Sequence, residues 1–545
     1  MNIIYYLGTV GMHSMLIGRI CLIGAVVVPI VAVAVSLVDD GLSGRRKATR
    51  LGWVSAAAAI IATIMVALNG PYSVTLNGGN GSPVFGLLAN QLTVTLLVLV
   101  CVVGALVQSF AVRYLQVDQV AKRFFAATNA VVASMAIVCT SATALVLVTA
   151  WVTAGLAFVV AIGYRSDLPG VRASARLTLK MFALGDTALV VAMILIWMQA
   201  GNVSLLQPAL TVSVASRLSK LSTIIALLIV IAALTRSAQA VLGRWMPGTV
   251  SAPTPVSALL HAGVVNGGGI LLIRFSALSS NSVLAMSAAF AVAILTAIVA
   301  TTIMSKKTDI KGSLAFSTMG QMGFMLAECT VGAYIAALLH LIGHAMYKAT
   351  MFFGSGSQIP RAGQVPVPPV KRVSTPIRLA ATAMTVAGSL AVMVIVPEVL
   401  THHGELIIMA FVAATVAAIC WSWWGICPAT PRTIIFWTIG MLVAGGLYGL
   451  VAGLLGSWMT PALPSVGSGV LSPWWLLSVA VAGIAIAGIN QVPAVRNWLQ
   501  ALLIDIGTPS TSIMIGREQG RIRGGGDSLP GYSYETPNTW SGSAA

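Results

Sequence analysis

The segment AALLHLIGHAMYKATMFF carries three titratable side chains at intervals of four residues: His340, His344 and Lys348. On an α-helix such positions lie about 40° apart and rise about 6 Å per step, so they form one narrow stripe about 12 Å long. Imidazole can accept a proton on one nitrogen and release one from the other, and a lysine amine can also change its charge. The spacing therefore predicts a proton relay, although the two histidines could also serve only to hydrogen-bond neighbouring helices.

The same HLIGH spacing would suit two ligands of a zinc ion. The glutamate of an HExxH motif is absent, and no third ligand is evident in the sequence. The six cysteines are scattered without a CxxC pair. We therefore expect no metal site and no cofactor in this chain.

Further polar residues lie inside or at the edge of long apolar runs. A charge at the centre of a bilayer costs about 2.5–3.5 kcal/mol even on the most lenient scale, so such residues should face a protein interior or a water-filled path. They are His261, Arg236, Asp186 and Lys180, with Glu328 and Asn266 as accessory candidates. Arginine keeps its proton, so Arg236 would act as a fixed charge, or alternatively as a clamp on a carboxylate such as Asp186.

The composition excludes a water-soluble fold. Of the 545 residues, 58% are hydrophobic and only 8% are charged, whereas soluble domains carry about 25% charged residues. Apolar runs near the roughly 20 residues that cross a bilayer recur along the chain. These runs, about fifteen of them, fall at 15–37, 52–68, 89–112, 124–140, 142–163, 177–199, 221–243, 255–276, 283–304, 312–328, 332–354, 379–397, 406–425, 434–456 and 473–490. They predict an all-α polytopic membrane protein.

The placement of charge sets an expected topology. A net charge of +17 could suggest nucleic acid, but the basic residues gather in every second loop between the runs, which is typical of cytoplasmic loops. We therefore expect a membrane partner rather than nucleic acid, with the N-terminus outside and the C-terminus inside. Residues 1–500 would form the transmembrane domain, and 501–545, rich in Gly, Ser, Thr and Pro, a disordered cytoplasmic tail.

Two long motifs carry a family resemblance: APTPVSALLHAGVVNGGGILLIR at 252–274 and DIKGSLAFSTMGQMGFMLAECTVGAYIAALLHLIGHAMYKATMFFGSGS at 309–357. They resemble the proton-pumping, antiporter-like subunits of respiratory complex I and of Mrp antiporters. Within that superfamily the motifs are most similar to the DabB-type membrane subunits of the DAB inorganic-carbon accumulation complexes. The resemblance implies two inverted five-helix repeats with broken helices. It also implies a central polar axis through Arg236, His261, His340, His344 and Lys348, with Asp186 in a matching position.

The resemblance also implies a function and a partner. A DAB-like chain would conduct protons or sodium ions in a bacterial plasma membrane, with no catalytic site of its own. It would couple the gradient to conversion of carbon dioxide to bicarbonate by a peripheral cytoplasmic, zinc-containing DabA-like subunit. The alternatives are a pumping subunit of a complex I-like, membrane hydrogenase or Mrp-type complex, and a non-conducting membrane anchor.

Two departures from the family pattern affect the first half of the path. The complex I subunits have a glutamate after the tryptophan of their fifth span, where this chain has Val152 after Trp151. They pair that glutamate with a lysine, where this chain has Arg236. Either protons enter by another route, such as Asp186 or Glu328, or only the second half of the path works. We expect the proton to move in that second half, with His340, His344 and Lys348.

Overall fold

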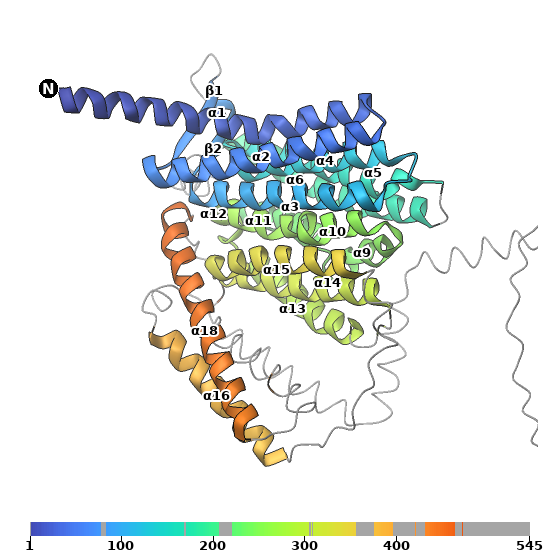
Figure 1. Ribbon diagram of the computed structural model, residues 1–545, viewed down its shortest axis with the longest axis vertical. Helices are drawn as coiled ribbons and strands as arrows, with labels where there is room; N and C mark the ends of the chain where they lie inside the picture. Colours follow the sequence, from blue (N-terminus) through green and yellow to red (C-terminus); the bar gives the residue numbers. More distant parts are fainter. Residues whose placement is uncertain are drawn as a thin grey trace, which may run out of the picture.

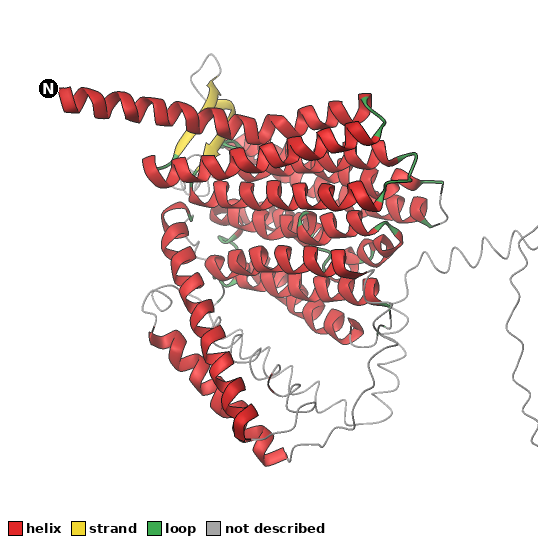
Figure 2. Cartoon of the chain, viewed as in Figure 1, coloured by secondary structure: helices red, strands yellow, loops and turns green. Residues whose placement is uncertain are grey.

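The computed structural model describes residues 2–77, 83–167, 170–205, 221–304, 307, 309–355, 375–395, 420, 431–463 and 471. Long helices dominate these residues and run alongside one another (Figures 1 and 2). In Figure 1, α1 and α2 line one side of the bundle, α13, α14 and α15 lie towards the other, and α16 and α18 cross obliquely.

The helices coincide with the expected apolar runs wherever those runs are described. They are α1 (Asn2–Val38), α2 (Leu42–Asn69), α3 (Gln91–Tyr114), α4 (Ala121–Thr140), α5 (Ala144–Ile162), α6 (Val171–Ala200), α8 (Ser222–Arg236), α10 (Thr254–Ala262), α11 (Gly267–Arg274), α13 (Val283–Met304), α14 (Ile310–Thr330), α15 (Tyr334–Gly354), α16 (Thr375–Ile395) and α18 (Pro431–Met459). Among the described residues, nine segments are long and apolar enough to cross a membrane. The chain is therefore a multi-pass membrane protein. The expected runs 406–425 and 473–490, and the tail 501–545, lie outside the described residues, Cys420 excepted.

A β-hairpin departs from the all-α expectation. Strand β1 (Tyr72–Asn77) pairs antiparallel with β2 (Pro83–Ala89) in the uncharged connection between α2 and α3. The Tyr72 hydroxyl donates a hydrogen bond to the Gly18 carbonyl oxygen at 3.0 Å, which ties the hairpin to α1. Tyr72, Val74 and Thr75 are residue types that favour strands, and a period-3.6 reading of the chain overlooks them.

The basic connections meet at one end of the bundle. Arg45 at the start of α2 donates to the carbonyl oxygens of Leu115 (2.7 Å) and Asp118 (2.8 Å), which follow α3. Arg165, which follows α5, forms an ion pair with the Asp118 carboxylate at 3.3 Å. Three basic connections are thus joined at what we term the basic end, and the hairpin marks the opposite, hairpin end (Figure 1).

Two of the apolar runs are interrupted where they contact each other. Helix α8 ends at Arg236, and Ala238 and Ala240 then adopt φ angles of 54° and 46°. The neighbouring run breaks at Gly263, where α10 ends and a 3₁₀ turn, η4 (Val264–Asn266), leads into α11. The Ser237 hydroxyl donates to the Val265 carbonyl oxygen at 2.7 Å, so each break supplies hydrogen-bond partners for the other.

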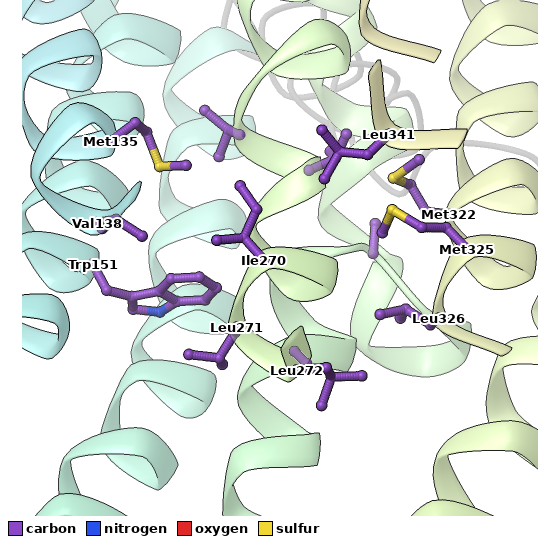
Figure 3. Close-up of a cluster of buried hydrophobic side chains, with 14 of the residues drawn as sticks. Met135, Val138, Trp151, Ile270, Leu271, Leu272, Met322, Met325, Leu326 and Leu341 are labelled. Atoms are coloured by element: carbon purple, nitrogen blue, oxygen red, sulfur yellow. The ribbon is translucent and has the colours of Figure 1, made fainter. Parts of the chain in front are cut away.

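The broken helix lies in the middle of the apolar core. Figure 3 shows Ile270, Leu271 and Leu272 of α11 between two groups of side chains. One group contains Trp151 of α5, and the other contains Met325 of α14. Helix α11 therefore lies between α5 and α14 in the core.

Candidate ion path

His340, His344 and Lys348 of α15 form what we name the relay stripe. It lies on the face of α15 that packs against α14 and α10. Lys348 is fully buried and His344 is 4% exposed. The Lys348 ammonium donates to the Leu314 carbonyl oxygen of α14 at 3.3 Å. Within the described part of the chain, no carboxylate lies within ion-pair distance of Lys348. A buried amine with only a carbonyl partner is free to exchange its proton without breaking an ion pair.

The other end of the stripe has a carboxylate. Glu328, near the end of α14, lies with Oε2 3.3 Å from Nδ1 of His340. The rings of His340 and His344 are 6.4 Å apart between centroids. Both ring nitrogens of His344 are buried and form no hydrogen bond with described residues. A side chain able to accept and release protons therefore lies unbonded between the ion pair and the lysine.

His261 approaches the stripe from α10. It is 1% exposed, and its ring stacks on Phe352 of α15 with centroids 4.5 Å apart and planes 12° apart. Its electrostatic neighbours include Lys348, and His344 in turn lies within range of His261. Nδ1 of His261 has no hydrogen-bond partner among the described residues. The structure thus brings His261 together with the relay stripe, as the sequence predicted.

Two other polar side chains flank His261 on the broken helix. Asn266 donates through Nδ2 to the Ala262 carbonyl oxygen at 3.0 Å, which satisfies a backbone group at the break, while its Oδ1 is unbonded. Ser257, one turn before His261, is buried and its hydroxyl has no partner within the described residues. Sequence reasoning missed Ser257, although its spacing of four residues from His261 was the available signal.

Cavities lie at both ends of this arrangement. One of about 390 Å³ lies between α13 and α14 and includes Glu328 in its wall. The other, of about 560 Å³, lies at the basic end between Tyr114, Asp309, Lys311 and Phe353. Leu314, the partner of Lys348, lies one turn along α14 from Lys311. The stripe therefore extends from the wall of one cavity towards the other.

A second buried site, which we term the clamp, lies across α11 and consists of Arg236, Asp186, Trp151 and Phe182. The Arg236 Nη2 lies 2.7 Å from Asp186 Oδ1, and the Trp151 indole Nε1 donates to the same oxygen at 2.8 Å. The guanidinium carbon lies 4.4 Å from the Trp151 ring centroid and 4.3 Å from that of Phe182. Arg236 is thus a fixed, paired charge, which is the alternative that the sequence left open.

Lys180 is separated from both groups. It lies on α6 like Asp186, but its side chain is exposed on the outer face of the bundle. The other predicted site residues divide between the two sides of α11. His261, His340, His344, Lys348 and Glu328 lie on the side of the stripe, Arg236 and Asp186 belong to the clamp, and Asn266 lies at the break between α10 and α11.

The fold and the buried polar axis define a membrane subunit of the antiporter-like class. Residues 141–430 match the family described as NADH:quinone oxidoreductase/Mrp antiporter, transmembrane. Residues 76–125 match the N-terminus of chain 5 of NADH-ubiquinone oxidoreductase, complex I. The first match covers more than half of the chain, and the chain belongs to that family.

The relatives include both inorganic-carbon transporter subunits and complex I subunits, the two groups that the sequence motifs resemble. The chain is 36% identical over 266 residues to the probable inorganic carbon transporter subunit DabB1 of Halothiobacillus neapolitanus, covering 48% of this chain and 47% of the relative. It is 34% identical over 278 residues to NADH-quinone oxidoreductase subunit L of Mycobacterium tuberculosis, covering 50% and 44%. The chain thus spans about half the length of the curated relatives that it matches.

A solved structure supports the fold. A chain of the Mrp complex from Dietzia sp. superposes with a TM-score of 0.61 at 23% identity, covering 92% of this chain and 59% of that chain. Identity at this level establishes a shared architecture of helices.

Proposed function

We propose that this chain conducts protons through the membrane along Glu328, His340, His344 and Lys348. The observation that carries the proposal is His344, a buried imidazole whose two nitrogens form no hydrogen bond with any described residue, set between a histidine–carboxylate pair and a buried lysine. A histidine that served only to hold helices together would use its nitrogens for hydrogen bonds. This one is available on both sides.

Ordered water completes the path in this proposal. A separation of 6.4 Å between the His340 and His344 rings exceeds a hydrogen bond but suits one bridging water. Buried polar groups nearly always have a partner, and sites with several unsatisfied atoms commonly hold water. His344, His261 and Ser257 all have unsatisfied atoms. Water at these atoms would carry protons between side chains that do not touch.

Repulsion between positive charges couples proton binding at the histidines to proton release from Lys348. His261 and His344 share the buried volume around Lys348. In a site of low dielectric, two positive charges so close disfavour each other strongly. A proton arriving on His344 therefore favours release of one from Lys348 towards the basic-end cavity.

The clamp leaves the first half of the chain without a comparable carrier. Arginine keeps its proton, and the Asp186 carboxylate already accepts hydrogen bonds from Arg236 and Trp151. The family departures at Val152 and Arg236 agree with this reading. We assign conduction to the second half and a structural role to the clamp.

In its wider setting, we propose that the chain couples a cation gradient to a partner subunit in a bacterial plasma membrane. The relatives named as inorganic carbon transporter subunits favour carbon accumulation with a peripheral DabA-like, zinc-containing partner. The basic end would face the cytoplasm by the positive-inside rule. The inverted repeats would place the α10–α11 break at the midplane, as in other transporters with discontinuous helices.

Lys348→Met tests conduction, with Lys47→Met, at an exposed position on α2, as a control. Proton uptake into proteoliposomes, read with a pH-sensitive dye, should fall by about tenfold or more in Lys348→Met because the terminal carrier is gone. Lys47→Met should conduct like the wild type. Wild-type uptake by a correctly folded Lys348→Met protein would rule out the proposed path and favour a membrane anchor.

Co-purification tests the partner. Affinity purification of the full chain from native membranes, followed by mass spectrometry, should recover a large peripheral zinc protein in about equal amount. Recovery of quinone-reducing or other antiporter subunits instead would assign the chain to a respiratory or Mrp-type complex. The Lys348→Met variant should retain the partner, since Lys348 is buried away from the surface.

A further inference from the structure

The outer face of α6 carries an uncompensated basic stripe. Arg172, Arg176 and Lys180 are spaced by four residues and are all exposed, so they form a strip about 12 Å long. Arg172 donates to the Ser166 carbonyl oxygen at 3.1 Å. None of the three forms an ion pair with a described residue. We name this feature the α6 basic stripe.

The carboxylates of the basic end are already engaged elsewhere. Asp118 and Asp167 pair with Arg165, at 3.3 and 2.9 Å. Asp39 pairs with Lys47 at 3.1 Å, and Asp40 pairs with Lys122. The described residues therefore leave the stripe without an internal counter-ion, and its charge is available to an external anion.

The length of α6 places the stripe at the membrane surface. The 17 residues from Lys180 to Trp197 rise about 26 Å, close to the roughly 30 Å hydrocarbon core of a bilayer. The face between them exposes Leu184 and Ile194, each about half exposed at 49% and 50%. Trp197, 63% exposed, then marks one interface, as aromatic residues commonly do, and Lys180 marks the other.

An apolar groove adjoins the stripe on the same face. It has a volume of about 290 Å³ and lies between α5 and α6, with Leu156 and Val159 on one wall and Leu179, Ala183 and Val190 on the other. Leu179 directly precedes Lys180 along the chain. Asp186 lies at the base of the groove, where its side chain is 13% exposed. The groove thus gives access from outside to the clamp.

We propose that the α6 basic stripe and this groove bind an anionic phospholipid. Guanidinium and ammonium groups recognise a phosphate, and the groove offers an apolar slot for one acyl chain directly below them. A single lipid supplies both a phosphate for the basic stripe and an acyl chain for the groove, whereas a soluble acidic protein could reach only the basic stripe. The acyl chain would cover Asp186 and keep water away from the Arg236–Asp186 ion pair.

Native mass spectrometry of the full chain in detergent tests this lipid site. The probes are phosphatidylglycerol and phosphatidylcholine with identical acyl chains. The wild type should retain phosphatidylglycerol in preference, and Arg172→Gln/Arg176→Gln/Lys180→Gln should reduce that preference by about tenfold or more, given the contribution of each basic residue at a membrane surface. Arg46→Gln/Arg50→Gln, which removes exposed charge from α2 at the same end, should leave it unchanged.

A second variant tests the groove separately from the charge. Ala183→Phe should fill the slot and lower retention of both lipids, while Val160→Phe, on an exposed part of α5 outside the groove, should lower neither. A triple variant that still prefers phosphatidylglycerol would overturn the proposal, as would an equal loss in the α2 control. Unchanged lipid preference with loss of a co-purifying membrane subunit would overturn it in favour of a protein contact.

Discussion

Glu328 connects the relay stripe to an open cavity. Within the described residues, it is the carboxylate that contacts a member of the stripe, with its Oε2 3.3 Å from Nδ1 of His340. It also forms part of the wall of the 390 Å³ cavity between α13 and α14. A carboxylate that borders a cavity and also contacts an imidazole is placed to pass a proton from one to the other.

Replacing Glu328 by Gln keeps the shape of the side chain and removes its ability to carry a proton. We expect proton uptake into proteoliposomes to fall by about tenfold, with little change in the unfolding temperature, because the amide can still bond to His340. Thr301→Val alters the same cavity without a titratable group and should conduct normally. Equal uptake by Glu328→Gln and the wild type would place proton access elsewhere.

The shared helical face of the three stripe residues was readable from the sequence because they repeat at intervals of four. The sequence analysis also counted Lys180 among the candidate path residues, because that lysine lies in the apolar run 177–199. The structure places Lys180 on the exposed outer face of α6, nine residues after that helix begins at Val171. Rotation of a helix about its axis decides burial, and Lys180 shares its face of α6 with Arg172 and Arg176, whose four-residue spacing marks that face as charged and exposed.

At the scale of elements, the sequence marks the break in one of the two interrupted runs with helix-breaking residues, but not the break in the other. Proline and glycine mark the run 255–276, and the break falls at Gly263, just ahead of the three consecutive glycines. No such residue marks the end of α8, where Ala238 and Ala240 adopt positive φ. That conformation costs an alanine about 1–2 kcal/mol, and tertiary hydrogen bonds such as Ser237 to Val265 stabilise it. A local reading of the sequence contains no sign of those partners.

The contact between the two breaks depends on a glycine. A Cβ atom on Gly268 would overlap the Ser237 hydroxyl and the Ala233 carbonyl oxygen. Gly268→Ala should therefore lower the stability by about 1–3 kcal/mol, seen as a lower unfolding temperature in detergent. Gly343→Ala on α15, where nothing lies within 4 Å of the added atom, should be neutral or slightly stabilising. Equal unfolding temperatures of the two variants would show that the breaks do not pack as described.

At the scale of the whole molecule, α11 separates two unlike polar sites. On one side, His344 of the relay stripe has nitrogens without a hydrogen-bond partner among the described residues, and on the other the clamp has a guanidinium between two aromatic rings and a paired carboxylate. Unsatisfied titratable groups suit proton exchange, whereas a saturated ion pair suits mechanical attachment of α8 to α5 and α6. In the function proposed above, one side of α11 conducts and the other holds the broken helices in place.

A double-mutant cycle on the clamp tests this division. Arg236→Met keeps a long side chain between the rings, and Asp186→Asn keeps an amide oxygen for the Trp151 indole. Each single change leaves an unpaired buried group and should destabilise the protein by about 3–5 kcal/mol. The double variant should recover most of that loss and should conduct protons at close to the wild-type rate, because no carrier has been removed. A stable double variant with abolished uptake would make the clamp part of the conducting path and extend the path across both sides of α11.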